Sequence, residues 1–427
     1  ALWLGSSIVE LAAAKSILMV GSSQRQEQPL LASRIRQAVK KGTQLNVLHI
    51  ADDELFTALN AKLIVSPAAL VNGLAQVLKA AVAVKGADTA LDLAAANVSA
   101  EAQAIADSLC ATDNAAIILG NVAQHHPAFA ELLALAQELS RVTGARFGIT
   151  AEAANSVGAD IAGANPARGP MGAAVTAGLS AAAMLAAPRK AYFLLNTEVE
   201  ADTYNGQQAV AAMKQAATVI ALTAYKGAGL LDYADVLLPI APFAETAGSF
   251  VNMEGKLQSF NGVVRPQGEA RPAWKVLRVL GNMLGLEGFE FNAAEEVRAE
   301  LLAKGDIAAK LGNAVQGVAA NVAAAAAGLV RAGEVPLYHA DAICRRADSL
   351  QQTAAAATPV VSLNPADAAR LGLNDGDNAV VSQGEASVTL QVRADKALAE
   401  GVVRVAAAHP ATQQLGGMFD PIQIKRG

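Results

Sequence analysis

Small and polar residues follow two apolar runs that read as buried strands. Gly21 and Ser22 come directly after one run. Gly120 and Asn121 come after another. In open parallel sheets, ligands bind at the carboxyl ends of strands, where the backbone N–H groups of a following loop are free to donate. These residues are therefore candidates for contact with a nucleotide, although the loop at Gly21 lacks the G-x-G-x-x-G pattern of the usual dinucleotide site.

A long polar insertion between residues 237 and 285 carries further candidates. Its segment 249–260 predicts a β-hairpin, because Gly255 allows the positive φ that a tight turn requires. Asn252 and Glu254 lie in that turn. Insertions of this length between a strand and a helix are typical of functional sites. A covering loop that holds no ligand is the alternative interpretation.

A helix is expected to end this insertion. Pro272 suits its first position and Gly285 its end. Four apolar residues fall on one face at helical spacing, and we expect them to lock two α/β units together. They are Trp274, Leu277, Leu280 and Leu284.

Other reactive side chains give weaker signals. Cys110 and Cys344 are too few to hold an iron–sulfur cluster, so we expect packed thiols. His125 and His126 are adjacent, and no further ligand stands at a metal-binding spacing. They favour a loop or the start of a helix. No metal site and no catalytic residue are predicted.

Composition excludes several classes of protein. The chain has 427 residues, enough for two to four domains, and a net charge of −5, which argues against a nucleic-acid surface. More than half of the residues are hydrophobic, yet we find no unbroken run of eighteen large apolar residues, so we expect a soluble protein. The first residue is Ala1, in what reads as a helix, and we expect the natural protein to start earlier.

The order of elements predicts an α/β protein in four parts. Alternating strands and helices indicate parallel sheets in the first two parts. An Ala-rich helix over 306–331 is expected in the third part, and several short strands with turns predict a barrel in the fourth. The parts are a first α/β unit (1–109), a second with the hairpin (110–285), a helical connector (286–350) and the barrel (351–427).

Three motifs occur in one order along the chain. They are E-x-x-G-x-F-x-N-x-E-G-K-x-Q at 245–258, G-E-A-R-P-x-W at 268–274 and N-P-A-D-A-A-R-L-G-L-x-D-G-D at 364–377. Together they resemble the molybdopterin oxidoreductase superfamily, of the formate dehydrogenase and DMSO reductase type. The resemblance covers nearly the whole chain. It implies two Rossmann-like parallel-sheet units, a helical connector and a C-terminal double-psi β-barrel like the dinucleotide-binding domain.

Two further segments, 21–36 and 154–166, are similar to the large peripheral-arm subunit, or G subunit, of bacterial NADH:quinone oxidoreductase, also called NADH dehydrogenase I or respiratory complex I. That enzyme belongs to the respiratory electron-transport chain. The similarity implies a structural portion without electron carriers, in a complex that oxidises NADH, reduces quinone and pumps protons. Iron–sulfur clusters would lie in the amino-terminal part of the same polypeptide, which this chain would contact together with other peripheral-arm subunits. Molybdopterin would be absent. The complex would sit on the cytoplasmic side of the inner membrane.

The resemblance also implies a vestigial pterin-dinucleotide cleft. Turn and cap roles are the alternative for the residues that would line it. Those residues are Gly21, Ser22, Gly120, Asn121, Asn252, Glu254, Asn364 and Asp377.

Two other functions stay open at this point. The first is an active molybdopterin-dependent oxidoreductase, such as a formate dehydrogenase, of which this chain is one portion. The second is a nucleotide-binding regulatory module without redox chemistry, which would use the strand ends at Gly21 or Gly120.

Overall fold

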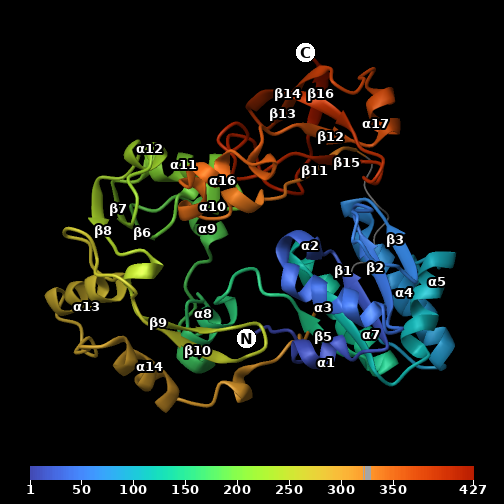
Figure 1. Cartoon of the computed structure of the whole chain (residues 1–427), viewed down its shortest axis with the longest axis horizontal. Helices are drawn as coiled ribbons and strands as arrows, with labels where there is room; N and C mark the ends of the chain where they lie inside the picture. Colours follow the sequence, from blue (N-terminus) through green and yellow to red (C-terminus); the bar gives the residue numbers. More distant parts are fainter. Residues whose placement is uncertain (321, 323–327) are drawn as a thin grey trace.

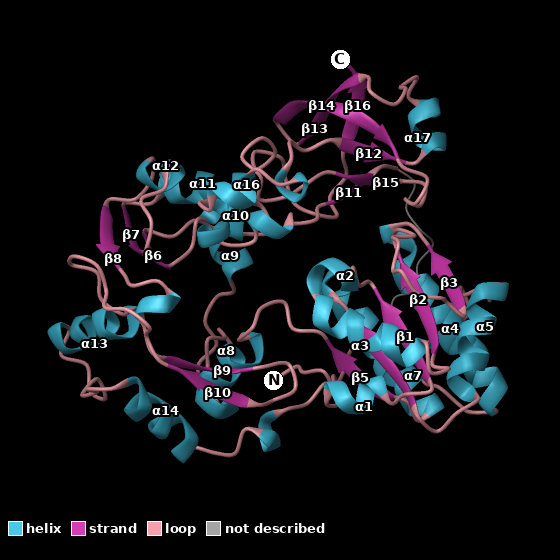
Figure 2. Cartoon of the chain, in the orientation of Figure 1, coloured by secondary structure: helices cyan, strands magenta, loops and turns pink. Residues whose placement is uncertain are grey.

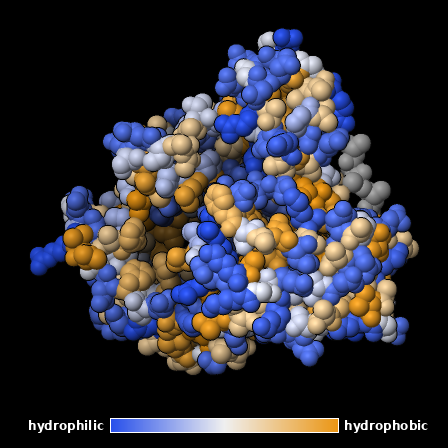
Figure 3. All heavy atoms as spheres, turned by 45° about the vertical axis from the view of Figure 1, so that its right-hand side comes forward, coloured by the Kyte–Doolittle hydropathy of each residue, from blue (hydrophilic) through white to orange (hydrophobic). Residues whose placement is uncertain are grey.

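The computed structural model describes residues 1–320, 322 and 328–427. Figure 1 shows an open ring in which a large sheet with its helices, a curled C-terminal sheet and a smaller sheet follow one another. In the parts that contain the large sheet and the smaller sheet, helices and strands alternate along the chain (Figure 2). The space-filling view in Figure 3 shows a deep hollow on one face, lined in part by hydrophobic atoms.

A five-stranded parallel sheet with strand order β3-β2-β1-β4-β5 forms the largest part of the core. Every residue of β1 and β4 is buried, because helices cover both faces. One face packs against α1 and α3, the other against α4, α5 and α7. The bounds are β1 (Ser16–Val20), β2 (Gln44–His49), β3 (Ala61–Ile64), β4 (Ala115–Leu119), β5 (Arg146–Ile149), α1 (Ile8–Ala12), α2 (Gln24–Glu27), α3 (Pro29–Val39), α4 (Leu70–Lys85), α5 (Ala100–Cys110), α6 (Asn121–Gln124) and α7 (Phe129–Thr143).

The strands that form this sheet do not follow the predicted domain boundary. The sequence placed the segments of β4 and β5 in the second α/β unit, beyond residue 109. In the structure β4 pairs with β1 over its whole length, and β5 pairs with β4. The predicted boundary therefore falls inside one sheet. Strand spacing along the chain does not tell which strands pair, because βαβ crossovers can place the next strand on either side.

One helical stretch, 67–85, is long and apolar enough by composition to cross a membrane, which the sequence reading overlooked. It consists of η1 (Pro67–Ala69) followed by α4. Over half of its most apolar window is buried, and Leu70, Leu74 and Leu78 are fully enclosed between the sheet and neighbouring helices. Its apolar character therefore matches a core helix.

A separate three-stranded parallel sheet has strand order β6-β7-β8. One face packs against α9 and α11. The other face carries Phe193, Leu195 and Val236, which are 43%, 48% and 42% exposed. The bounds are β6 (Ala191–Leu195), β7 (Thr218–Thr223), β8 (Val236–Pro239), α8 (Ser156–Ala162), α9 (Ala181–Ala186), α10 (Val199–Asp202), α11 (Gly206–Gln215) and α12 (Ala228–Leu231).

The predicted hairpin is confirmed. Strands β9 (Gly248–Val251) and β10 (Leu257–Phe260) pair antiparallel, and Gly255 in the turn has φ +79°. The Asn155 side chain accepts from Val251 N, at 2.9 Å, and Leu4 N donates to Met253 O, at 2.8 Å. The hairpin is therefore fastened to the amino-terminal segment and to the loop before α8.

The predicted helix after the hairpin is present as α13 (Ala273–Met283), with Pro272 as its N-cap. On its predicted apolar face, Trp274, Leu277 and Leu280 are partly buried, but the prediction is wrong for Leu284, which is 65% exposed. The expected role of this face in joining two α/β units stays a prediction. Amphipathic spacing predicts a helix with an apolar face, but it does not show which element covers that face.

The predicted Ala-rich helix over 306–331 is also wrong for the residues that the structure describes. A single turn, η4 (Ala308–Lys310), is followed by irregular chain up to residue 320, and β11 (Val330–Ala332) is a strand; residues 321 and 323–327 lie outside the described part. Asn313 bonds to both backbone groups of Trp3 and to Phe147 O. These contacts hold the stretch against the amino-terminal segment and β5 in a region with few large side chains to pack as a helix. Upstream lies α14 (Ala294–Ala303).

The carboxyl-terminal part is a curled sheet of order β11-β15-β12-β14-β13-β16. A bridge between Val330 and Pro421 brings its two edge strands together. Its parallel and antiparallel pairs, with the parallel sheets before it, confirm the predicted α/β class with a small C-terminal barrel. The bounds are β12 (Val361–Leu363), β13 (Asn378–Gln383), β14 (Ala386–Ala394), β15 (Val402–Arg404), β16 (Gln423–Arg426), α15 (Ala342–Arg345), α16 (Asp348–Gln351) and α17 (Pro365–Arg370).

Candidate functional site

The strand order of the first sheet reverses between β1 and β4, which is where open α/β sheets bind ligands. Gly21 and Ser22 follow β1, and Gly120 and Asn121 follow β4. Backbone bonds hold the two ends together, from Gly120 N to Val20 O at 2.9 Å and from Ala123 N to Gly21 O at 3.1 Å. The structure therefore brings together four of the eight predicted site residues.

The two glycines at these strand ends serve close packing of the protein against itself. A Cβ atom on Gly120 would lie 2.2 Å from the Cβ of Ser22. A Cβ atom on Gly21 would lie 2.6 Å from the backbone nitrogen of Ala123. These positions therefore require glycine, because the neighbouring loops approach the backbone too closely for any side chain.

Several polar side chains near these strand ends are buried. Ser22 is 6% exposed, and its hydroxyl has no hydrogen-bond partner. Ser23 Oγ lies 3.4 Å from His49 Nε2, while His49 Nδ1 has no partner. Burial lowers the pKa of His49 to about 4, so the imidazole is neutral near pH 7.

The C-terminal barrel packs against the segments that follow β2 and β4. Ile50, Val122, Leu398 and Val402 share a small apolar core across the contact. Phe419 of the barrel also meets the ring of His126 edge-on, with the ring centroids 5.4 Å apart. The barrel therefore lies beside the strand ends at which the candidate residues were predicted.

A charged group lies beside this apolar contact. Arg404 of β15 lies 3.0 Å from Asp53, 3.0 Å from Glu334 and 3.9 Å from Asp395. At the end of α2, burial, followed by repulsion from Glu334, raises the pKa of Glu27 to about 7. The single guanidinium of Arg404 is thus surrounded by more than one carboxyl group. Local sequence pattern did not single out any of these five residues.

The other four predicted site residues lie away from the strand ends and have structural partners. In the hairpin, Asn252 Oδ1 accepts from the backbone of Glu254, and Glu254 Oε1 accepts from Ile8 N at 2.8 Å. In the barrel, Asn364 caps α17, and Asp377 accepts from Asn374 N at 2.9 Å. The turn and cap interpretation accounts for their contacts.

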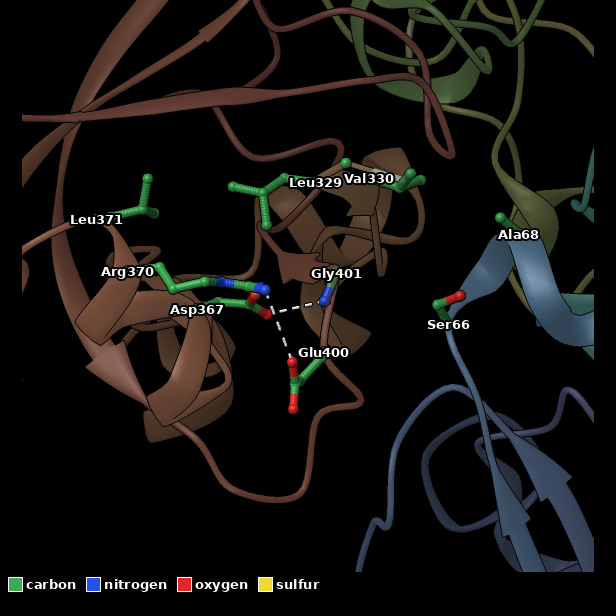
Figure 4. A pocket seen from close by; sticks show the side chains of 10 residues that line it. Ser66, Ala68, Leu329, Val330, Asp367, Arg370, Leu371, Glu400 and Gly401 are labelled. Atoms are coloured by element: carbon green, nitrogen blue, oxygen red, sulfur yellow. Dashed lines mark hydrogen bonds and ion pairs between the residues drawn. The ribbon is translucent and has the colours of Figure 1, made fainter. Parts of the chain in front are cut away.

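A cavity of about 410 Å³ lies between the barrel and the loop after β3, and no predicted site residue lines it. Figure 4 shows Arg370, Asp367 and Glu400 on its barrel side, with Ser66 opposite. The buried Asp367 pairs with Arg370 and accepts from Gly401 N. The basic side chain is therefore engaged by the protein's own carboxylates.

Metal-ligating groups do not cluster in the part of the chain that the structure describes. There, no group of three or more His, Cys, Asp or Glu residues could hold an ion. Cys110 and Cys344 are half-buried free thiols. His125 ends α6 and lies 2.6 Å from Glu152, as an ion pair rather than a metal ligand.

The strand ends fit an anionic pterin dinucleotide poorly. Asp53 and Glu334 are acidic groups at the contact between the barrel and the first sheet, and the Arg404 between them is already engaged by both. Bringing a further anion among buried carboxylates raises the electrostatic free energy. The unpartnered Ser22 hydroxyl is the feature in favour of a ligand. No chemical step through such a group follows from this arrangement.

Comparison with known proteins identifies relatives of this chain. The Molybdopterin oxidoreductase family model matches residues 1–283, and the Molydopterin dinucleotide binding domain model matches residues 333–420. The chain is 45% identical over 69 residues to the F420-dependent formate dehydrogenase 1 subunit alpha of Methanococcus maripaludis, a match that covers 16% of the chain and 10% of that protein. It is 33% identical over 69 residues to a putative formate dehydrogenase of Staphylococcus aureus, covering 16% and 7%. The matched segment thus spans a tenth or less of these relatives.

The fold is similar to that of acetylene hydratase from Pelobacter acetylenicus, with a TM-score of 0.64 and 17% identity over 96% of this chain and 74% of that one. These comparisons confirm the superfamily that the motifs resemble. They do not identify the chain as part of the NADH:quinone oxidoreductase, and the formate dehydrogenase relatives support the alternative oxidoreductase better. Because the family match covers well over half of its residues, the chain belongs to the molybdopterin oxidoreductase family.

Proposed function

We propose that this chain is a structural portion, without a redox cofactor of its own, of the G subunit of a bacterial proton-pumping NADH:quinone oxidoreductase. The observation that carries the proposal is the occupied crevice between β1 and β4. Gly120 packs directly against Ser22 at this crevice, which supports a structural role for the strand ends. The carboxylates around Arg404 disfavour an anionic dinucleotide nearby and support the same proposal. The assignment to this particular enzyme rests on segments 21–36 and 154–166.

The partner in this proposal is the iron–sulfur-bearing part of the same polypeptide. An apolar surface supports the existence of a partner on the second α/β unit. It consists of one face of the β6–β8 sheet, with Phe193 and Leu195, and of α13, with Met283. Parallel sheets are covered on both faces, and helices with an apolar stripe bury it. We propose that the contact lies on this surface. The cytoplasmic side of the inner membrane as the site of the complex belongs to the same proposal and rests on segments 21–36 and 154–166.

Isolation of the natural complex through an affinity tag on this protein tests the proposal. We expect NADH oxidation with quinone as acceptor, iron–sulfur signals in the electron paramagnetic resonance spectrum and no stoichiometric molybdenum. Acid extraction should release no guanine nucleotide. About one molybdenum atom per chain together with a released guanine dinucleotide would contradict the cofactor-free role. Isolation without any NADH-oxidising partner would contradict the assignment to the NADH:quinone oxidoreductase.

A second candidate is the active molybdopterin-dependent oxidoreductase, with formate as substrate. The named relatives, which are formate dehydrogenases, favour it over the first candidate. The unpartnered, buried Ser22 hydroxyl at the strand ends is the structural feature on its side. In this case the tagged preparation would reduce an artificial electron acceptor with formate and would lose that activity when molybdenum is replaced by tungsten in the growth medium. NADH would not serve as the donor.

A further inference from the structure

A segment that leaves the barrel after β11 connects the barrel to the second α/β unit. This bridging segment spans residues 335–357 and carries η5 (Leu337–His339), α15, α16 and η6 (Ala354–Ala356) before the chain returns to the barrel at β12. Figure 1 shows it in orange between the smaller sheet and the barrel. Single helical turns are unstable alone, because nucleation of a helix is costly, so the segment depends on its contacts with both neighbours.

Two arginines fix the bridging segment to the second unit. Arg345 Nε donates to Glu198 Oε2 at 3.1 Å, and Arg345 Nη2 donates to Asp202 Oδ1 at 2.9 Å. Arg346 pairs with Glu198 as well. On this side of the segment, two cations thus face two anions.

On the barrel side, two histidine rings meet. His339 of η5 contacts His409, in the loop after β15, edge-on, with the ring centroids 4.6 Å apart and the ring planes inclined by 62°. His339 is 5% exposed, and within the described part of the chain neither of its ring nitrogens has a hydrogen-bond partner. A buried charge without a partner is costly. The enclosed His339 ring therefore suits this contact in its neutral form.

The backbone favours a neutral ring at His409 too. His409 Nδ1 accepts a hydrogen bond from Ala411 N at 3.1 Å, and a nitrogen that accepts carries no proton. A proton on Nδ1 would set two donors against each other and break this bond. The carbonyl oxygen of His409 accepts from Thr412 N at 2.9 Å and from Gln413 N at 2.8 Å, so the loop holds the ring in place.

The charges around the two rings act in the same direction. Arg345 Nη1 donates to the carbonyl oxygen of His339 at 2.9 Å, which brings a guanidinium beside the imidazole. Burial, followed by repulsion from Arg345, lowers the pKa of His339. Burial, followed by repulsion from His339, lowers the pKa of His409. No carboxylate in the described part of the chain acts on either ring, from α16, from η6 or from the barrel, and Glu198 and Asp202 are engaged by Arg345.

We propose that His339 and His409 form an acid-sensitive joint, which holds the barrel to the bridging segment while both rings are neutral and opens when either ring takes up a proton. Because Arg345 and Arg346 keep the segment on the second unit, opening frees the barrel to move relative to that unit. The joint does not depend on which enzyme the chain belongs to.

The direction of the pH effect follows from linkage. An exposed histidine has a pKa of about 6.5. Both histidines have a lower pKa in the closed joint, so opening takes up protons. The stabilisation is therefore fully present above about pH 6.5 and is lost as the pH falls below that value and through the lowered pKa of each ring.

Hydrogen exchange of the whole chain between pH 5 and 8 tests the joint. The reporters are the amides of His339 and Arg345, which bond to Pro336 O and Asp341 O inside the bridging segment. Their rates are divided by the intrinsic rate at each pH. We expect their protection to be about tenfold lower at pH 5 than at pH 8, a factor in the range expected for charging a buried group without a partner. Amides in the centre of β1 should keep their protection.

The double variant His339→Gln, His409→Asn removes both titrating rings, and the introduced amide oxygen at position 409 can still accept from Ala411 N. It should keep the same protection at pH 5 as at pH 8. His125→Gln changes a histidine of the first unit that pairs with Glu152, and it should retain the acid dependence of the wild type.

Three results would overturn the joint. They are wild-type protection that is equal at pH 5 and 8, an equal loss of protection in the centre of β1, and a double variant that keeps the wild-type acid dependence. Should the double variant not fold, His409→Asn alone takes its place. A weaker acid dependence than in the wild type then supports the joint, and an unchanged one refutes it.

Discussion

Arg404 of the barrel and Asp53 of the first sheet form a two-pronged ion pair, with Nη1 3.1 Å from Oδ1 and Nη2 3.0 Å from Oδ2. The two residues are 351 positions apart in the sequence. Their pairing joins the barrel to the loop after β2 and leaves Glu334 and Asp395 to share the same guanidinium. The contact between the barrel and the sheet therefore depends on this arginine.

Arg404→Ala should destabilise the chain by about 2–3 kcal/mol. The substitution leaves Asp53 and Glu334 without their counter-charge. The expected loss of stability is smaller than for a fully buried ion pair, because both carboxylates retain some contact with solvent. Urea unfolding followed by circular dichroism measures the change. Arg141→Ala, which breaks an exposed pair with Glu138, serves as control and should cost under about 1 kcal/mol. Equal losses in the two variants would show that the barrel contact has no special dependence on Arg404.

Gly120→Ala should destabilise the chain by about 2–3 kcal/mol or prevent its folding. The new methyl group would overlap Ser22, whose side chain and backbone lie within 2.5 Å of it. At Gly312 a Cβ atom meets nothing within 4 Å, so Gly312→Ala should change the free energy of unfolding little. Thermal unfolding compares the pair. A Gly120→Ala protein as stable as the wild type would mean that the crevice at the strand ends is open.

Gly255→Val should lower stability and impair assembly of the parent complex. Valine is strained at φ +79°, and its Cβ atom would lie 2.3 Å from Leu311 Cδ1. Gly285→Val has the same kind of backbone strain at φ +68° but meets no neighbour within 4 Å. We therefore expect the Gly255 variant to be less stable by about 1 kcal/mol more than the Gly285 variant. A normally folded Gly255→Val protein that selectively lost a bound nucleotide would instead indicate a ligand at the hairpin.

Met283→Glu should leave the isolated chain as stable as the wild type and prevent assembly with its partner. The side chain is 80% exposed, so a charge there costs little until the apolar surface of α13 is covered. Leu30→Glu is the matched control, since Leu30 of α3 is 83% exposed on the first unit. Co-purification of the tagged variants with the NADH-oxidising complex measures the outcome. Normal assembly of Met283→Glu would remove α13 from the proposed contact.

Some elements could be predicted because their cause is local. Gly255 allows a turn by its own backbone freedom, and the hairpin follows from that residue and the strands around it. In the barrel, Val388, Leu390 and Val392 alternate with polar residues, and all three are buried. The predicted helix after the insertion is present for the same kind of reason, since Pro272 and the apolar spacing act within a few residues.

Other features could not be predicted, because they depend on residues far apart in the sequence. The same spacing that predicts α13 does not show how far its apolar face is covered: Leu284 is exposed, whereas Leu277 is partly buried. The long helix predicted over 306–331 is absent where the Asn313 side chain bonds to the backbone of Trp3. This contact joins residues 310 positions apart, and no local pattern records it.

The sequence by itself determined the family, through motifs at 245–258, 268–274 and 364–377, and with it the α/β sheets and the barrel. It also placed Gly21, Ser22, Gly120 and Asn121 at strand ends, since each follows an apolar run. Only the tertiary structure decided that these ends meet, that Ser22 packs against Gly120, and that Arg404 of the barrel pairs with Asp53. The physical reason is the separation in sequence between the residues that interact. Turns and strand periodicity arise from neighbours in the chain, whereas burial, charge repulsion and pKa shifts arise from neighbours in space.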